Sequence, residues 1–263
     1  MIDIHSHILP GIDDGAADIG ISLEMARIAV QQGTTHMACT PHIMPGVYEN
    51  DKSIIRATMD KLRASLFEAD IQLQLLIGAD AHITPNLLEN LKSGHTPSLA
   101  DNKYFLFEPP HHVCPPNMPA FCKKLIDGGY IPILTHPERL TWVEKRYDVV
   151  CEIDEIGAPI QLTAASITGK FGKRAKYWSD RMLDEGRVDV IASDAHDPQH
   201  RPPGMIEARD LIVKRYSDTV ANILTKENPG KILLGKELPK KKRNKPTETK
   251  QSKTSWKNWI GLN

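Results

Sequence analysis

Short apolar segments that resemble buried β-strands recur along the first 235 residues and alternate with stretches of helical periodicity. The predicted strands are 2–5, 35–40, 72–77, 104–108, 131–135, 159–163 and 188–193. Nearly continuous apolar strands that are separated by helices predict a parallel sheet that is buried on both faces. The alternation therefore restricts the chain to the α/β class, as either a closed barrel or an open doubly wound sheet.

Helical periodicity is clearest in three of the intervals between these strands, at 23–30, 55–66 and 119–127. Gly33 is placed to end the first helix, and Gly128 and Gly129 follow the last. Seven strand–helix units in a chain of 263 residues favour a barrel. The open sheet remains the alternative fold.

Histidine and carboxylate side chains stand at the ends of six predicted strands, which is where a barrel carries its functional residues. They are His5, His7, His42, Asp80, Glu108, His136, Asp194 and His196. Side chains two positions apart on a strand point to the same side. The His5/His7 and Asp194/His196 pairs are therefore each able to grip one ion.

These eight groups predict a metal centre. A single histidine at a strand end is more often a hydrogen-bonded packing residue than a ligand. Here, however, six predicted strands end in a histidine or a carboxylate. Gathering so many ionisable groups without a cation costs desolvation and carboxylate repulsion. Imidazole and carboxylate without thiolate suit Mn²⁺, Fe²⁺ or Zn²⁺. Eight ligands exceed the needs of one catalytic ion, so we expect two or three ions, with Asp80 and Glu108 able to bridge.

Two arginines closely follow candidate ligands, Arg139 after His136 and Arg201 after His196. A planar guanidinium matches phosphate oxygens in a bidentate way, whereas the alternative for each is an ordinary surface arginine. Phosphate is the substrate group that calls for both several metal ions and arginine. The pattern predicts a phosphoester hydrolase in which His42 or His196 is able to protonate the leaving group.

The C-terminal segment 236–263 differs from the rest of the chain in charge. It holds nine Lys/Arg and two Glu, a net charge of +7, which leaves −7 for residues 1–235 because the whole chain is neutral. An acidic body is not typical of a nucleic-acid-binding protein. The tail is predicted to be a disordered basic end, and docking on an anionic membrane is the alternative.

The cysteines exclude a cysteine-phosphatase mechanism, because that mechanism needs an arginine six residues after the nucleophile. The positions six after Cys39, Cys114, Cys122 and Cys151 are Pro45, Ala120, Gly128 and Gly157. The absence of a CxxC pair, of an apparent signal peptide and of a membrane-length apolar run predicts a soluble, reduced, cytoplasmic protein.

Several motifs together resemble a known family. They are MIDIHSHILPGIDDGAA at 1–17, TPH at 40–42, FEP at 107–109, HPER at 136–139, TAASITGKFGKR at 163–174 and ASDAHDPQHRPP at 192–203. In this order and spacing they are similar to the PHP (polymerase and histidinol phosphatase) superfamily, and most of all to its bacterial capsular-polysaccharide-type protein-tyrosine phosphatases. The resemblance covers residues 1 to about 235.

The resemblance implies a distorted (β/α)7 TIM-like barrel over residues 1–235 and a trinuclear centre that is usually assayed with manganese. It also implies hydrolysis of phosphotyrosine on an autophosphorylated tyrosine kinase that controls capsule or exopolysaccharide synthesis. Carried over by motif, the eight strand-end residues are the ligands, and Arg139 and Arg201 hold the phosphate. Relatives typically have glutamate where this chain has the shorter Asp80, and His82 is a candidate to compensate.

Two other functions fit the same residues: a PHP phosphatase of a small phosphomonoester such as histidinol phosphate, and a non-catalytic regulator that binds a kinase. Two weaker signals also leave alternatives. Asp13 and Asp14 either accept hydrogen bonds from ligand histidines or simply form a turn. The glycine-rich segment 169–174 lacks Walker spacing and is predicted to be a loop or helix start rather than a phosphate loop.

Overall fold

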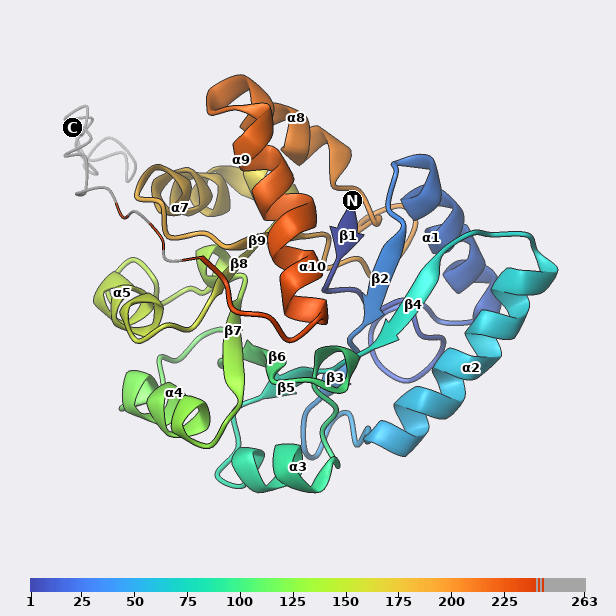
Figure 1. Cartoon of the computed structure of the whole chain (residues 1–263), viewed down its shortest axis with the longest axis horizontal. Coiled ribbons are helices and arrows are strands. Elements are labelled where there is room, and N and C mark those ends of the chain that lie inside the picture. Colours follow the sequence, from blue (N-terminus) through green and yellow to red (C-terminus); the bar gives the residue numbers. More distant parts are fainter. Residues whose placement is uncertain (240, 242, 244–263) are drawn as a thin grey trace, which may run out of the picture.

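The computed structural model describes residues 1–239, 241 and 243, and every strand pairing in it is parallel. One sheet has the order β1 (Ile2–Asp3), β2 (His36–Cys39), β4 (Gln74–Ile77). The other has the order β3 (His42–Ile43), β5 (Asp80–His82), β6 (Tyr104–Glu108), β7 (Ile131–Thr135), β8 (Ile160–Thr163), β9 (Val190–Ala192). The predicted α/β class with a parallel sheet is confirmed (Figure 1).

The two sheets continue one another along the chain. Strand β3 follows β2 after two residues, and β5 follows β4 after Gly78 and Ala79. Gly78 fits this step because a Cβ there would lie 2.8 Å from Leu99 Cδ2 and 3.0 Å from Thr40 Cγ2. The short strands β3 and β5 were not among the predicted ones, although the first begins at His42 and the second at Asp80.

The end of β9 lies beside the segment that follows β1. Ser6 and Ala195 form a parallel bridge, and the amide of His7 donates to the carbonyl oxygen of Ala195 at 2.8 Å. The amide of Asp194 donates to the carbonyl oxygen of His5 at 2.9 Å. The first and last predicted strand ends are therefore neighbours, and each carries candidate ligands.

Helices surround the strands (Figure 1). They are α1 (Ile19–Gln31), α2 (Lys52–Glu68), α3 (Leu87–Ser93), α4 (Met118–Asp127), α5 (Tyr147–Glu155), α6 (Ala164–Ile167), α7 (Gly172–Asp184), α8 (Ile206–Arg215), α9 (Asp218–Asn222) and α10 (Asn228–Leu233). Short helical turns are Leu99–Asp101, Pro137–Arg139 and Ile223–Glu227. The three predicted helices are confirmed as α1, α2 and α4. Asp18 and Asp51 cap the first two by accepting backbone N–H bonds. Segment 169–174 contains the start of α7, as predicted.

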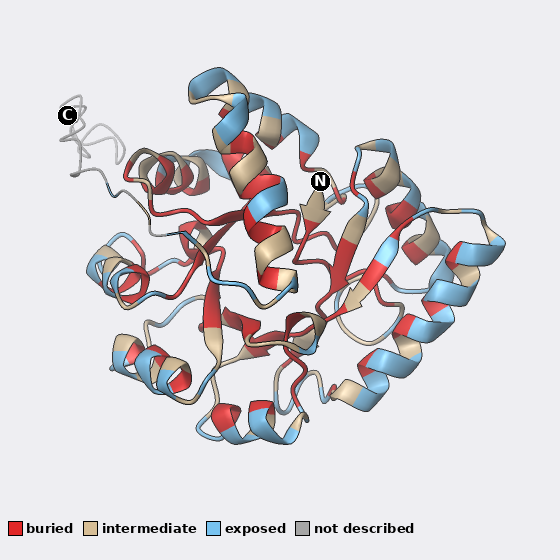
Figure 2. Cartoon of the chain, viewed as in Figure 1, coloured by how far each residue is buried: buried red, intermediate tan, exposed pale blue. Residues whose placement is uncertain are grey.

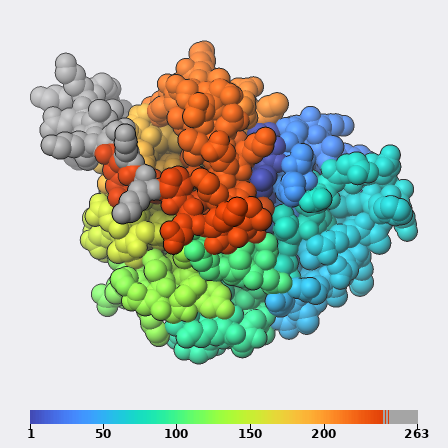
Figure 3. Space-filling view, in the orientation of Figure 1, coloured from blue at the N-terminus to red at the C-terminus, as the bar shows by residue number. Residues whose placement is uncertain are grey.

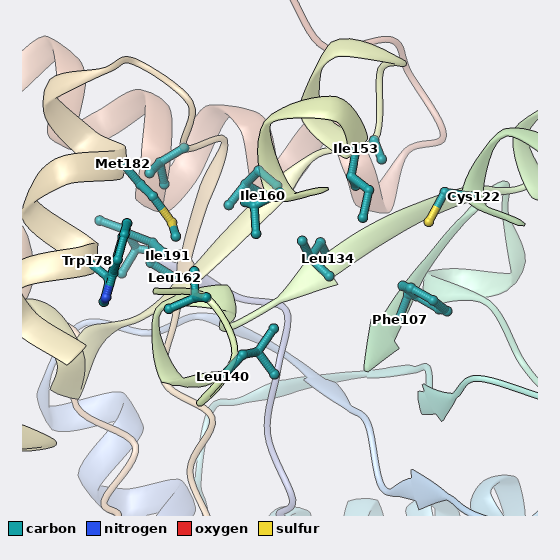
Figure 4. Packing of buried hydrophobic residues seen from close by; sticks show 14 of the residues in the cluster. Phe107, Cys122, Leu134, Leu140, Ile153, Ile160, Leu162, Trp178, Met182 and Ile191 are labelled. Atoms are coloured by element: carbon teal, nitrogen blue, oxygen red, sulfur yellow. The ribbon is translucent and has the colours of Figure 1, made fainter. Parts of the chain in front are cut away.

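The core lies between the strands and the inner faces of the helices, whereas the outer helix faces are exposed (Figure 2). Leu134, Ile160 and Leu162 on β7 and β8 are fully buried in one large cluster, which Trp178 and Met182 of α7 join (Figure 4). This apolar packing fixes the strand ends on which the candidate ligands stand. None of the helices in the described ranges has both the length and the apolar character needed to cross a membrane.

The start of the predicted tail contacts the rest of the molecule. The hydroxyl of Tyr104 donates to the carbonyl oxygen of Lys236 at 2.9 Å, and the Lys241 ammonium lies 2.5 Å from carboxylate oxygens of Asp154 and Asp189. Arg243 Nε is 2.7 Å from Asp154 Oδ2. Figure 3 shows this orange and red C-terminal part lying across one face of the molecule. The remainder of the predicted disordered tail lies outside the described residues.

Candidate metal centre

The predicted ligands of the first and last strands meet around one point. His5 Nε2 lies 3.2 Å from His7 Nε2 and 3.4 Å from Asp194 Oδ1. His7 Nε2 is 3.5 Å from the same Asp194 oxygen. Asp80, brought in by β5, places Oδ2 3.4 Å from His5 Nε2. Four side chains that are far apart in sequence thus present donor atoms to a common space.

Glu108 at the end of β6 connects the neighbouring ligands. One of its oxygens lies 3.4 Å from His136 Nε2, and the other lies 3.3 Å from His42 Nδ1. His82 Nε2 is 2.7 Å from the second oxygen. His42 Nδ1 is in turn 3.6 Å from Asp80 Oδ2, so Asp80 and Glu108 stand between separate groups of histidines.

His196 completes the set, together with a carboxylate that was not among the predicted ligands. Asp14 Oδ1 lies 3.5 Å from His42 Nε2 and 3.6 Å from His196 Nε2. Four groups have donor atoms within 4.8 Å of one another: His7/Asp14/His42/His196, His5/His7/Asp80, His42/His82/Glu108 and Asp80/Glu108/His136. These groups contain seven of the eight predicted ligands, and the eighth, Asp194, lies beside His5 and His7. The fold therefore brings all eight together, with Asp14 and His82 next to them.

These residues fit divalent cations. The Asp80 side chain is fully buried, yet neither of its oxygens has a hydrogen-bond partner among the described residues. A buried, unpaired carboxylate is costly unless a cation or donor compensates it. The surrounding donors are imidazole nitrogens and carboxylate oxygens, the types that bind Mn²⁺, Fe²⁺ or Zn²⁺.

Two of the candidate ligands have left-handed backbone conformations. His136 has φ of 33° and Asp194 has φ of 54°, although neither is glycine. Such conformations cost about 1–3 kcal/mol each, and they persist where the surroundings impose them, often at functional sites. Both residues come directly or almost directly after a strand, where the turn aims their side chains at the cluster.

Other polar side chains orient the candidate ligands. Asp13 Oδ2 lies 2.6 Å from His7 Nδ1 and accepts the His42 amide at 3.1 Å, so the predicted orienting role of Asp13 is supported by geometry. Gln161 Oε1 is 2.9 Å from His5 Nδ1. Gln161 was not singled out in the sequence, where its only signal is a polar side chain within an otherwise apolar strand.

Ionisation favours the metal-binding forms of several groups. Burial, with the nearby Arg139 charge, lowers the pKa of His136 to about 3, so its imidazole is neutral. Burial would raise the pKa of Asp194, but His5 and Arg201 hold it well below the usual value. His7 is the exception: burial would lower its pKa, but Asp13 and Asp194 raise it to about 10, so a cation that binds there must displace the imidazole proton.

The two predicted phosphate-binding arginines lie together at the edge of the cluster. Arg201 Nη2 donates to Asp194 Oδ2 at 2.7 Å, and Arg139 Nη1 donates to the same oxygen. Their side chains are 24% and 21% exposed, so both are accessible from solvent. A pair of guanidinium groups beside a cation-binding cluster forms a place for an oxyanion.

The cysteines do not contribute to this centre. Cys39 and Cys122 are buried hydrophobic-core residues, and burial raises the pKa of each thiol to about 12. Burial also raises the pKa of Cys114 and Cys151. A nucleophilic thiolate needs the opposite shift. The structure thus agrees with the prediction that cysteine chemistry is excluded.

Comparison with known proteins gives the same picture. The family model described as capsular polysaccharide synthesis, CpsB/CapC, matches residues 1–234. The tyrosine-protein phosphatase YwqE of Bacillus subtilis is 37% identical over 86% of this chain and 89% of its own length. The putative tyrosine-protein phosphatase CapC of Staphylococcus aureus is 30% identical over the full length of both.

A solved structure agrees with these sequence matches. It comes from work on YwqE from Bacillus subtilis and CpsB from Streptococcus pneumoniae, described as unique metal-dependent tyrosine phosphatases. It aligns with a TM-score of 0.89 and 35% identity, covering 94% of this chain and 100% of that chain. The chain belongs to the CpsB/CapC family of capsular polysaccharide synthesis.

Proposed function

We propose that this protein is a metal-dependent protein-tyrosine phosphatase that hydrolyses phosphotyrosine on a protein. The observation that carries the proposal is the convergence of eight predicted ligands beside Arg139 and Arg201. The proposed substrate is an autophosphorylated tyrosine kinase of capsule or exopolysaccharide assembly, because the relatives are named as tyrosine phosphatases and the family as one of capsule synthesis. Such a kinase uses ATP, so we place the reaction in the cytoplasm.

Two or three divalent ions, with Mn²⁺ favoured and Fe²⁺ or Zn²⁺ as alternatives, would occupy the centre. The proposed ligands are His5, His7, His42, Asp80, Glu108, His136, Asp194 and His196, and Asp14 is added from its position. Asp80 and Glu108 each belong to two of the donor groups, which suits a bridging role. When bound, such ions polarise the phosphoryl oxygens and lower the pKa of water.

The catalytic unit is proposed to be a distorted seven-stranded barrel over residues 1–235. In this arrangement β2/β3 and β4/β5 each count as one broken strand, and the Ser6–Ala195 bridge closes the ring between β9 and the first strand. A barrel gathers the carboxyl ends of its strands at one mouth. The positions of the donor residues follow directly from such a fold.

The protein's own residues have distinct parts in the reaction. Arg139 and Arg201 hold the phosphoryl oxygens, and Asp194 fixes both guanidinium groups. The leaving group is a phenolate whose conjugate acid has a pKa near ~10, so it needs little assistance. His42 or His196, which lie on either side of Asp14 Oδ1, would supply a proton to it through a water molecule.

A matrix of metals and substrates tests the proposal. The purified protein is freed of metal, reloaded with Mn²⁺, Fe²⁺ or Zn²⁺, and assayed with a phosphotyrosyl peptide and with histidinol phosphate. We expect metal-dependent turnover that favours the peptide, and almost none for Asp194→Ala. Full activity after exhaustive chelation contradicts the metal mechanism. A preference for histidinol phosphate supports the small-substrate alternative, and inactivity with every metal supports the non-catalytic one.

A further inference from the structure

One aromatic ring lies against both of the proposed phosphate-binding arginines. The Arg139 guanidinium carbon is 4.7 Å from the centre of the Phe171 ring, and that of Arg201 is 5.9 Å from it. Both distances are within the range of cation–π contacts. Phe171 therefore marks one side of the place where the phosphoryl group is proposed to bind.

The loop that carries Phe171 is shaped to hold this ring in place. Gly169 and Gly172 on either side have φ of 85° and 87°, values that favour glycine. The Phe171 amide donates to the carbonyl oxygen of Ala165 at 3.4 Å, and the Gly172 amide donates to that of Gly169 at 2.9 Å. The main chain at Phe171 is thus positioned by the loop itself, independently of the arginines.

Part of the Phe171 ring is accessible. Its residue is only half-buried, and it borders two hollows. One is a cavity of about 150 Å³ that Arg201 also lines; Ala164, Ala165 and Pro202 give it apolar walls, and polar side chains that include Lys170 and Glu207 line the rest. The other lies toward Tyr177 of α7. An apolar surface that begins directly beside two oxyanion-binding cations suits a ligand with a ring attached to its phosphate.

We propose that Phe171 forms an aryl subsite: the ring of the phosphotyrosine lies against Phe171, on the side of the Arg201 cavity, while the two arginines hold the phosphoryl group. This inference rests on the proposed function. Aromatic pairs favour offset or edge-to-face packing, which an alkyl phosphate such as phosphoserine does not offer. The subsite therefore selects aryl over alkyl phosphomonoesters.

The test compares Phe171→Leu with the wild-type Mn²⁺-loaded protein, using kcat/KM for a phosphotyrosyl peptide and competitive inhibition by inorganic phosphate. Phosphate reports on the groups that bind the phosphoryl oxygens, without the proposed subsite, because it has no ring. We expect kcat/KM to fall about 3- to 10-fold, mainly through KM, while the inhibition constant of phosphate stays unchanged. Phe171→Tyr keeps an aromatic face and should restore the wild-type value.

The matched control is Tyr177→Leu, which removes another aromatic ring that lines the neighbouring hollow and whose centre lies 5.3 Å from that of the Trp178 ring. It should leave both constants unchanged. Phe171→Met is the second variant if the leucine protein does not fold, as judged by circular dichroism. Unchanged peptide kinetics overturn the subsite, and so does an equal loss for peptide and phosphate, which means that Phe171 only positions the arginines. A wild-type protein that neither turns over the peptide nor binds phosphate contradicts the proposed function instead.

Discussion

At the scale of single residues, Asp194 lies between the candidate metal ligands and the two arginines. It is near His5 and His7, accepts hydrogen bonds from Arg139 and Arg201, and does so from a left-handed backbone conformation. This carboxylate contacts both the candidate metal ligands and the two arginines that are proposed to bind phosphate, so it links the metal centre to the phosphate-binding site. Its charge, more than its shape, is what these neighbours require.

Asp194→Asn separates charge from shape, since asparagine tolerates the left-handed conformation and keeps nearly the same size. We expect metal affinity to fall about 10- to 100-fold or more, because one anionic ligand is replaced by a neutral amide. Metal content after dialysis, measured by elemental analysis, checks this. Asp127→Asn in the exposed end of α4 is the control, and equal metal content in both variants would contradict the assignment.

His82 tests a finer point about the centre. Its Nε2 lies 2.7 Å from Glu108 Oε2, so removing the ring leaves that carboxylate less well oriented. His82→Ala should weaken Mn²⁺ binding about 10-fold in a chelator competition assay. His95→Ala, an exposed histidine outside the cluster, should bind Mn²⁺ like the wild type. An unchanged Mn²⁺ affinity in His82→Ala would mean that His82 does not support the metal centre.

At the scale of elements, the sequence predicts the strand positions and three of the helices, whereas α5, α8 and most of α7 were not predicted. Strands β6 and β7 have the predicted limits, and Glu108 at the end of β6 and His136 directly after β7 lie in the cluster. The short strands β3 and β5 carry no periodicity of their own, so only the register with their neighbours reveals them. Asp14 was not predicted as a metal ligand because the sequence of its loop is equally compatible with a simple turn. Its role depends on how that loop folds back over His42 and His196.

The same loop contains Gly15, and any larger residue at this position would force the loop to move away from His7. A Cβ on Gly15 would lie 2.1 Å from the His7 carbonyl oxygen and 2.4 Å from His7 Cβ. Gly15→Ala must therefore displace the loop, and with it the Asp13–His7 contact. We expect about 1–3 kcal/mol lower free energy of unfolding in urea, together with weaker Mn²⁺ binding.

The control for this prediction is Gly230→Ala in α10. A Cβ there meets only Ile2 Cδ1, at an ordinary 3.5 Å, and alanine favours helix. This variant should be as stable as the wild type or more stable. If Gly15→Ala behaved in the same way, the close approach of the loop to His7 would not limit the site.

At the scale of the whole molecule, different features lie at the carboxyl ends and at the amino ends of the strands. The candidate ligands follow the carboxyl ends, whereas the C-terminal segment packs near the opposite ends. Asp189 directly precedes β9, and Tyr104, which holds the Lys236 carbonyl oxygen, begins β6. The described part of the basic tail thus neutralises acids of the body at a distance from the proposed reaction. We therefore expect Lys241 and Arg243 to stabilise the folded protein.

Lys241→Ala with Arg243→Ala tests this stabilising role. Asp154 is fully buried, and the double change leaves it with Arg187, at 3.0 Å, as its cationic partner among the described residues. It also leaves Asp189 without Lys241. We expect about 1–3 kcal/mol lower free energy of unfolding at pH 7, measured in urea. Lys61→Ala with Lys92→Ala removes the same charge from exposed helix positions and should change stability far less.

The pH dependence gives the sharper test of the same contact. Burial would raise the pKa of Asp154, but Arg243 and Lys241 hold it below the usual value. A carboxylate whose folded pKa is lowered stabilises the protein above its unfolded pKa of about 4, and this stability is lost as pH falls through the folded pKa. The stability difference between the wild type and the double variant should therefore be larger at pH 7 than below about pH 4. Its decline should begin above pH 4, because burial raises the pKa of Asp189, which also loses Lys241. A difference that is absent at pH 7, or constant down to acid pH, would mean that the tail does not neutralise Asp154.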